Sequence, residues 1–192
     1  MQRLEQTGHF QVALTRRRGE VVEYAERVAR AEAWRAEAWI SVHSDVRGRA
    51  NAWEPRPGSF CQRSRSEPGF AVIYSDEAEP ELVLRRRSLA LEIGSSLKAA
   101  GFHAYAGRSY AVDYQLESEE RAVFLDRRSP GSRIFVLHRP RTPSVLIETH
   151  NALHDGEVVR WDEPETREAF AQALVAALYS ALSASQSVDR RK

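Results

Sequence analysis

The chain has 192 residues, of which 42% are hydrophobic, and its 28 basic and 27 acidic side chains leave a formal net charge of +1. This length supports one domain with a full hydrophobic core and is too short for two comfortable ones. Because the charges nearly cancel, no overall positive field favours nucleic acid or an anionic membrane as a partner. The single cysteine, Cys61, excludes an intrachain disulfide and a zinc site built from thiolates.

The sequence predicts no transmembrane segment, because no stretch approaches roughly eighteen consecutive apolar residues. Residues 1–7 lack the basic and then apolar layout of a signal peptide. The localisation of the protein therefore stays unknown from the chain itself.

In the first part of the chain, the pattern predicts a strand, a helix and a second strand. The first strand is expected over Gln11–Leu14, and apolar residues at helical spacing predict a helix over Val21–Ala38. The run Trp39-Ile40-Ser41-Val42 then predicts a buried strand that ends at His43. A strand, helix, strand succession is typical of a parallel sheet.

The middle of the chain begins with a polar, proline-rich and arginine-rich stretch over residues 44–68, which predicts a long loop. A strand is expected over Phe70–Tyr74 and a helix over Glu81–Ala100, with Gly101 as its C-terminal stop. Residues 111–128 are ambiguous, since part of this segment suits either a strand or a helical turn.

The last part of the chain predicts two more buried strands, Ile134–Leu137 and Ser144–Ile147, followed by a helix from Glu165 to about Leu182. Together these elements predict an α/β fold, a three-layer sandwich with a mainly parallel twisted sheet flanked by helices. We expect one catalytic domain over residues 1–184 and a disordered tail over residues 185–192.

Two residues with chemical potential stand where predicted strands give way to loops. His43 follows one apolar run, and Glu148 follows Ser144-Val145-Leu146-Ile147. Sites in open α/β sheets gather beyond the carboxyl ends of strands, so both side chains are expected in one crevice. A histidine that can bind a metal and a carboxylate that can act as a general base indicate metal-assisted hydrolysis.

Each of these residues also has a plainer interpretation. A histidine such as His43 is often held by a backbone carbonyl rather than by a metal. Glu148 could form an ion pair with Arg16 or Arg141 in this arginine-rich chain. Trp53, in the predicted long loop, is interpreted as packing, with stacking on a sugar as the alternative.

The order of several short motifs resembles the zinc-dependent N-acetylmuramoyl-L-alanine amidases of the amidase_3 type. These motifs are Leu14-Thr15-Arg16, then Arg27 in a helix, then Ile40-Ser41-Val42-His43, and finally Pro143-Ser144-Val145-Leu146-Ile147-Glu148-Thr149. In that family a strand closes on Leu-Thr-Arg, and a helix carries an arginine sixteen residues before a Ser-Ile-His signature. Arg27 and His43 have that spacing.

The resemblance implies a peptidoglycan hydrolase that cleaves the amide between N-acetylmuramic acid and L-alanine. The family uses one zinc ion held by two histidines and a glutamate, and it works outside the cytoplasm. By resemblance, His43 is a zinc ligand and Glu148 is the acid/base that activates the metal-bound water. Peptidoglycan or a muropeptide is the expected substrate, with no nucleic acid partner.

The same resemblance predicts gaps in this chain. The family's first zinc histidine lies in a Gly-His-Gly-Gly stretch after the first strand, and a glutamate ligand opens the first helix. Both would precede residue 1, so the first strand and two of the three zinc ligands are expected to be missing, through N-terminal truncation or loss of the metal site. Alternative functions are a non-catalytic relative that binds cell-wall glycopeptide or a partner protein, and a different zinc-dependent amidohydrolase.

A final departure from the family concerns the residues after Glu148 and Thr149. The family usually has Gly-Phe there, whereas this chain has His150-Asn151. His150 lies two positions from Glu148, which in an extended segment puts both side chains on one face. We therefore expect His150 to bind substrate or to reach a metal held by His43.

Overall fold

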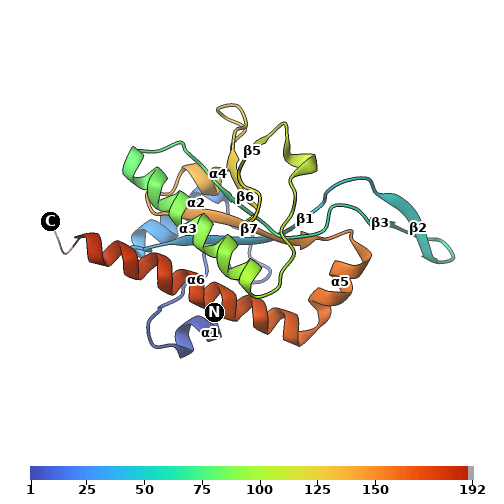
Figure 1. The fold of residues 1–192 in the computed structure, drawn as a ribbon, viewed down its shortest axis with the longest axis horizontal. Coiled ribbons are helices and arrows are strands. Elements are labelled where there is room, and N and C mark those ends of the chain that lie inside the picture. Colours follow the sequence, from blue (N-terminus) through green and yellow to red (C-terminus); the bar gives the residue numbers. More distant parts are fainter. Residues whose placement is uncertain (190–192) are drawn as a thin grey trace.

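The computed structural model describes residues 1–189, with side chains as far as residue 183. Its centre is a five-stranded sheet in the order β1-β7-β4-β6-β5 (Figure 1). The strands are β1 (Trp39–Asp45), β4 (Ala71–Tyr74), β5 (Tyr114–Ser118), β6 (Val123–Asp126) and β7 (Ser144–Asn151).

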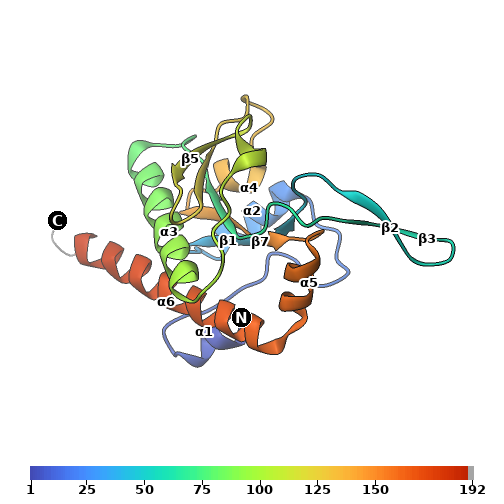
Figure 2. The ribbon, with the colours of Figure 1, turned by 45° about the vertical axis from the view of Figure 1, so that its right-hand side comes forward.

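Helices cover both faces of this sheet, so the predicted three-layer α/β sandwich is confirmed. Helices α3 and α6 pack together on one face, and α2 and α4 lie on the other (Figures 1 and 2). The helices are α1 (Gln2–Gln6), α2 (Tyr24–Ala33), α3 (Pro80–Ala99), α4 (Phe135–His138), α5 (Asp155–Asp162) and α6 (Pro164–Asp189), with a 3-10 turn η1 (Arg108–Tyr110).

The strand directions are mixed rather than mainly parallel. Strand β1 runs parallel to β7, and β4 runs parallel to β6, but β7 and β4 are antiparallel, as are β6 and β5. The carboxyl ends of the two parallel pairs therefore lie at opposite ends of the sheet. We call the end that holds His43 and Glu148 the glutamate end, and the end that holds Asp76, Asp126 and Arg128 the arginine end.

Two predicted strands are wrong. Residues 11–14 have no regular structure, so the helix α2 does not connect two strands of the sheet. Residues 134–137 contribute to helix α4, where Leu137 N–H bonds the carbonyl of Ile134 at 2.9 Å. An apolar run of four residues does not distinguish a strand from a buried helical turn, and here packing against α2 and Trp39 decides for the helix.

Two predicted elements around the core are confirmed closely. Strand β4 occupies residues 71–74, and α3 begins at Pro80, a favourable first helical position, and is followed by Gly101 at a φ of +82°. Helix α3 also approaches the sheet closely at Gly94, where an added Cβ would lie 2.3 Å from the carbonyl oxygen of Arg121. The ambiguous segment 111–128 contains β5 and β6.

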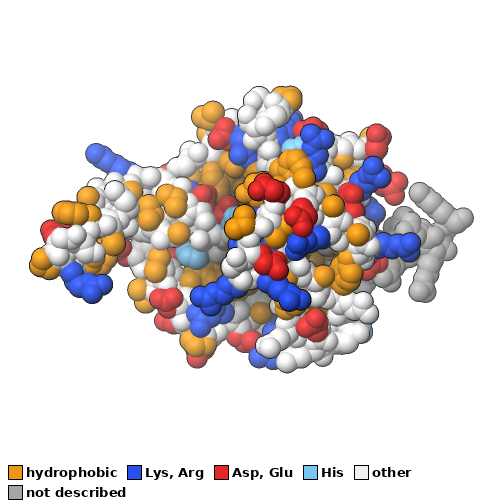
Figure 3. All heavy atoms as spheres, turned by 180° about the vertical axis from the view of Figure 1, so that it is seen from behind, with side chains coloured by type: hydrophobic (Ala, Val, Ile, Leu, Met, Phe, Trp, Pro, Cys, Tyr) orange, Lys and Arg blue, Asp and Glu red, His pale blue; other side chains and the backbone are white. Residues whose placement is uncertain are grey.

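The expected long loop over residues 44–68 contains a second, two-stranded sheet instead. Strands β2 (Asn51–Arg56) and β3 (Ser59–Arg63) form an antiparallel hairpin that projects from the body (Figures 2 and 3). The prolines and arginines of this stretch led to the prediction of a loop. The hairpin is exposed and therefore lacks the buried apolar run by which the other strands were predicted.

The C-terminal helix is longer than predicted. A disordered tail was predicted over residues 185–192, but helix α6 continues to Asp189. Residues 190–192 lie outside the described part of the chain.

Strand β1 lies at one edge of the five-stranded sheet, and no described strand pairs with its outer side. Among the described helices, none is both long enough and apolar enough to cross a membrane.

Candidate active site

The parallel pairing of β1 and β7 places the two predicted site residues side by side. His43 is the register partner of Glu148, just as Trp39 is the partner of Ser144 at the start of the ladder. Paired residues on neighbouring strands point to the same face, so the two side chains share one face at the glutamate end. The register therefore places the two residues next to each other, and the shared crevice stays a prediction.

Glu148 is a half-buried carboxyl group with unused hydrogen-bonding capacity. Its Oε2 atom is buried and has no hydrogen-bond partner among the described residues. Burial, reinforced by the negative charge of Asp45 and opposed by Arg47, raises the pKa of Glu148 to about 7. A carboxyl group with a pKa close to neutral can exchange protons under physiological conditions, which is what a general acid/base requires.

The plainer interpretation of Glu148 is wrong. No ion pair joins this carboxylate to Arg16 or Arg141 in the part of the chain that the structure describes. The positive charge that acts on Glu148 is instead that of Arg47, a residue that the sequence analysis did not single out.

His43 is more exposed than Glu148 and has a side-chain neighbour rather than a backbone carbonyl. Its Nε2 atom lies 3.1 Å from the Oγ atom of Ser41, two residues earlier on the same face of β1. Partial burial and the positive charges of Arg27 and Arg16 lower the pKa of His43. Arg27 from the predicted motif therefore lies near His43, and both effects favour the neutral imidazole over the charged one.

His150 turns to the side chain of Trp161 on α5. The rings of His150 and Trp161 stack with centroids 5.1 Å apart and an interplanar angle of 17°. The pairing of β1 and β7 is irregular just before this point, with a register shift between His43 and Asp45. The Nδ1 atom of His150 lies 2.9 Å from the Oγ1 atom of Thr149, whose hydroxyl donates to the carbonyl of His43 at 2.8 Å. His150 has no described contact with the side chains of His43 or Glu148, and its role in substrate binding stays a prediction.

A second group of residues at the glutamate end was missed. The hydroxyl of Tyr110 donates to Oδ2 of Asp45, and the Nε atom of Arg47 lies 3.4 Å from the same oxygen. Arg47 is only 2% exposed, its Nη2 donates to the carbonyl of Gly69, and its guanidinium lies 4.0 Å from the ring centroid of Tyr105. The Nε and Nη1 atoms of Arg47 have no hydrogen-bond partner among the described residues.

These missed residues differ in how far the sequence could have revealed them. Asp45 and Arg47 follow His43 by two and four residues, so their nearness to the strand end was a usable signal. Tyr110 lies 65 residues from Asp45 along the chain, in a segment without a clear pattern. Nothing in a single sequence predicts that contact.

A buried amide fixes the backbone behind the site. The side chain of Asn151 is fully buried, and its Nδ2 atom donates to the carbonyls of Arg47 at 3.0 Å and Ser66 at 3.1 Å. The carboxylate of Glu157 accepts from Gly69 N–H and Asn151 N–H, each at 2.8 Å. The end of β7 is therefore joined rigidly to the segments on either side of the β2–β3 hairpin.

The residues present do not fit the zinc site that the resemblance implied. No group of three or more His, Cys, Asp or Glu side chains could hold a metal ion within the described residues. A catalytic zinc needs three protein ligands and an open position, whereas the described residues place no second or third ligand beside His43 and two arginines lie near it.

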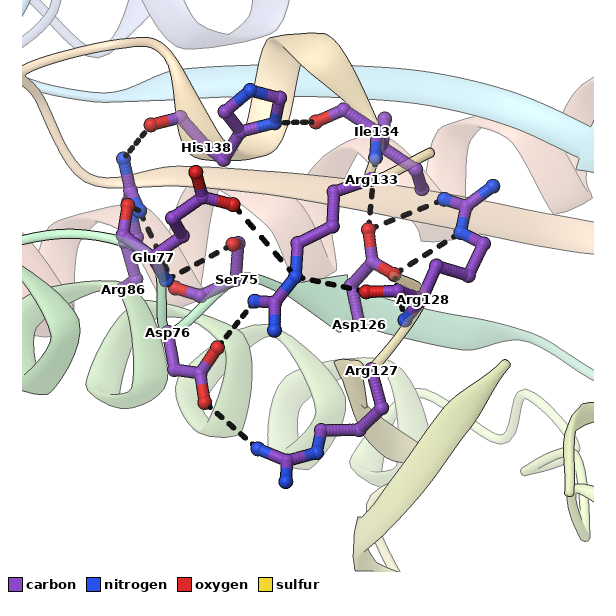
Figure 4. A network of polar contacts seen from close by, with 10 residues as sticks. All are labelled: Ser75, Asp76, Glu77, Arg86, Asp126, Arg127, Arg128, Arg133, Ile134 and His138. Carbon is purple, nitrogen blue, oxygen red and sulfur yellow. Dashed lines mark hydrogen bonds and ion pairs between the residues drawn. The ribbon is translucent and has the colours of Figure 1, made fainter. Parts of the chain in front are cut away.

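The arginine end is built differently. Asp126 is fully buried and accepts hydrogen bonds from Ile134 N–H at 2.9 Å and from the backbone N–H, Nε and Nη2 of Arg128 (Figure 4). Asp76 accepts from Nη1 of both Arg127 and Arg133. These contacts pair the carboxylates with arginines and close the loop after β6, which is a structural arrangement rather than a reactive one.

The fold is an α/β/α sandwich in which a half-buried glutamate and a histidine are register partners on adjacent parallel strands. The profile of the Amidase_3 family, described as N-acetylmuramoyl-L-alanine amidase, matches residues 1–180. The chain therefore belongs to this family of peptidoglycan amidases.

Solved structures of amidases have the same fold. The N-acetylmuramyl-L-alanine amidase Ami1 from Mycobacterium abscessus aligns with a TM-score of 0.70 and 21% identity over 94% of this chain and 72% of that one. Ami1 from Mycobacterium smegmatis gives 0.69 and 21% over 95% and 73%. The catalytic domain of CwlV from Bacillus (Paenibacillus) polymyxa var. colistinus gives 0.61 and 16% over 95% and 80%. No curated protein sequence matches this chain.

Proposed function

We propose that this protein hydrolyses the amide bond between N-acetylmuramic acid and L-alanine in peptidoglycan, with Glu148 as the acid/base. Membership of the amidase family supports the substrate class. The observation that carries the residue assignment is the buried, unpartnered Oε2 atom of Glu148 and the pKa of about 7 that its surroundings give it.

The chemistry of Glu148 follows from this pKa. Amide hydrolysis needs a base to take a proton from the attacking water and an acid to protonate the leaving nitrogen. A carboxyl group with a pKa near 7 is ionised often enough to accept the first proton and is then acidic enough to deliver it. The positive charge of Arg47, which has two nitrogens without a hydrogen-bond partner among the described residues, lies close enough to stabilise the ionised form of Glu148.

Zinc would supply a Lewis acid at this site, and its presence in the protein stays a prediction. A zinc ion on His43 would need two further protein ligands, and the described residues do not supply them. The same observation supports a second candidate function, in which the domain binds cell-wall glycopeptide or a partner without cleaving it.

Digestion of soluble muropeptides separates these two functions. The purified protein, with zinc added or chelated, should release peptides with a free N-terminal L-alanine, detected by mass spectrometry. Glu148→Gln keeps the shape of the side chain and removes the proton acceptor, so turnover should fall about a hundredfold or more. Glu119→Gln, at an exposed position away from the site, is the matched control and should behave as the parent.

The measurement also includes the zinc content of each variant. If the parent holds zinc, Glu148→Gln should keep it, whereas His43→Ala should lose metal and turnover together. Muropeptide binding without cleavage in every zinc condition would favour the non-catalytic function. Undiminished turnover in Glu148→Gln would contradict the role given to this carboxyl group.

A further inference from the structure

The β2–β3 hairpin begins and ends at the candidate active site. The chain enters it from Asp45 and Arg47 and leaves it at Ser64. Ser64 N–H bonds the carbonyl of Leu153 at 2.6 Å, and the Ser64 hydroxyl bonds the carbonyl of Arg49 at 3.0 Å. The base of the hairpin is therefore fixed to the segment that directly follows the strand of Glu148.

Beyond this base, the hairpin stands free of the body (Figure 2). Within the described part of the chain, no hydrogen bond, ion pair or ring contact joins residues 51–63 to residues outside the hairpin. A two-stranded hairpin gains little stability by itself in water, and most gain it by packing on something else. A fixed base and an unpacked arm are the features expected of a surface that meets a partner.

The arm exposes large aromatic rings on both of its faces. Phe60 is 77% exposed and Trp53 is 43% exposed. Trp53 pairs with Cys61 across the ladder, so Trp53 shares the face of Cys61, and the neighbouring Phe60 points to the opposite face. Exposed rings of this size on a projecting element mark a binding surface more often than isolated apolar residues do.

The same arm is basic, although the chain as a whole is nearly neutral. Between residues 49 and 65 there are four arginines and one acidic residue, Glu54. The guanidinium of Arg63 lies 5.1 Å from the ring centroid of Trp53, which places a positive charge beside an aromatic face. Figure 3 shows hydrophobic and basic side chains gathered along the projecting arm.

We propose that the β2–β3 hairpin is a peptidoglycan-binding arm, in which Trp53 packs against a sugar ring while Arg63 and Arg56 pair with carboxylates of the peptide stems. This inference rests on the proposed function. Peptidoglycan presents apolar sugar faces and anionic stems side by side along one polymer, which complements an arm with alternating aromatic and cationic groups. The polymer extends beyond the bond that is cleaved, so an arm beside the active site can hold it.

Sedimentation with purified, insoluble peptidoglycan tests this arm. The assay uses protein with Glu148→Gln, so that the polymer is not consumed, and a reducing agent that keeps the exposed Cys61 free. Trp53→Ala and Arg63→Ala should each weaken retention by about tenfold, the size of a moderate hot-spot truncation. The arginine effect should shrink as salt rises, since exposed charges are screened.

The chain offers matched controls for both variants. Trp34 is 47% exposed at the end of α2, close to the exposure of Trp53, and Arg85 is exposed on α3. Trp34→Ala and Arg85→Ala should be retained as well as the parent. All four variants should keep the melting temperature of the parent, because none of these side chains lies in the core.

Three outcomes would overturn the arm. The first is an equal loss of retention on peptidoglycan in the hairpin variants and in their controls. The second is failure of the parent to sediment with peptidoglycan. A hairpin variant that loses a dimer of the parent in light scattering, with unchanged retention, would assign the arm to a second copy of the chain. Cleavage of soluble muropeptides is measured separately, so its absence would contradict the proposed function without deciding the role of the arm.

Discussion

The two ends of the central sheet treat buried charge in opposite ways. At the arginine end, the buried carboxylate of Asp126 accepts four hydrogen bonds, from Arg128 and from the backbone of Ile134. At the glutamate end, one buried oxygen of Glu148 and two nitrogens of Arg47 have no hydrogen-bond partner among the described residues. Both ends lie beyond the carboxyl ends of a parallel strand pair, so topology alone does not explain the difference.

The arginine end is adapted to stability, and the glutamate end is adapted to chemistry. A satisfied carboxylate keeps its charge and holds a loop, whereas a desolvated one with an unused oxygen has a shifted pKa and can exchange protons. The arginine end is not wholly satisfied, because Nε of the buried Arg86 has no partner among the described residues. The Nη1 and Nη2 atoms of Arg86 nevertheless donate to the carbonyls of Ser75, Glu77, His138 and Pro140.

The largest effect on folding is expected at the arginine end. Asp126→Ala removes the acceptor for Ile134 N–H and leaves Arg128 without its ion pair, so the free energy of unfolding should fall by about 3 kcal/mol. Urea denaturation at pH 7 measures this change. Glu119→Ala, at an exposed position, should change it by less than about 0.5 kcal/mol. A cost for Asp126→Ala as small as that of the control would remove the structural role of this end.

A smaller effect, of opposite sign, is expected from Glu148→Gln. The pKa of Glu148 is raised from an ordinary value of 4.5 to about 7 in the folded protein, so between these pH values the folded chain binds more protons than the unfolded chain. This group therefore lowers the free energy of unfolding as pH rises from about 4.5 to 7, by about 2 kcal/mol after allowance for solvent screening.

Glutamine carries no charge at either pH, so the variant should not show this fall in the free energy of unfolding. Glu148→Gln should accordingly be more stable than the parent at pH 8 by about 2 kcal/mol and nearly equal to it at pH 4. Urea midpoints of both proteins across this range test the prediction. A parent whose stability relative to Glu148→Gln rose from pH 4 to pH 8 would show that the folded protein favours the ionised form of Glu148, and the contrast between the ends would be lost.

The smallest effect concerns the hydroxyl of Tyr110. Tyr110→Phe removes one donor to Asp45, which still accepts from Val46 N–H at 2.7 Å and lies near Arg47, so the expected loss of stability is about 1 kcal/mol. Tyr114→Phe is the matched control, because its hydroxyl has no described hydrogen bond, and its cost should stay below about 0.5 kcal/mol. Equal costs for the two variants would show that the Tyr110–Asp45 contact adds nothing to the glutamate end.

The local sequence was sufficient for elements with strong patterns. The apolar run before Glu148 became the buried part of strand β7, and the run before His43 became β1. The long helix α3 was found for the same kind of reason. Strand β1 lies at the edge of the sheet and only Trp39 in it is buried, so the prediction of a buried strand there was wrong. The exposed hairpin and the short helix α4 were missed, because neither has a period that a sequence reveals.

The features of the candidate site also fall into those that the local sequence determines and those that packing determines. The sequence by itself determined that a histidine and a glutamate follow apolar runs, since residue identity and local period are properties of neighbouring positions. The predicted strand ends were wrong, because β1 continues to Asp45 and β7 continues to Asn151. Only the tertiary structure decided that β4 runs antiparallel to β7, that Tyr110 reaches Asp45 across 65 residues, and that Arg47 is buried beside Asp45. The pKa of Glu148 belongs to this second group, because it is set by burial and by charges that packing brings together.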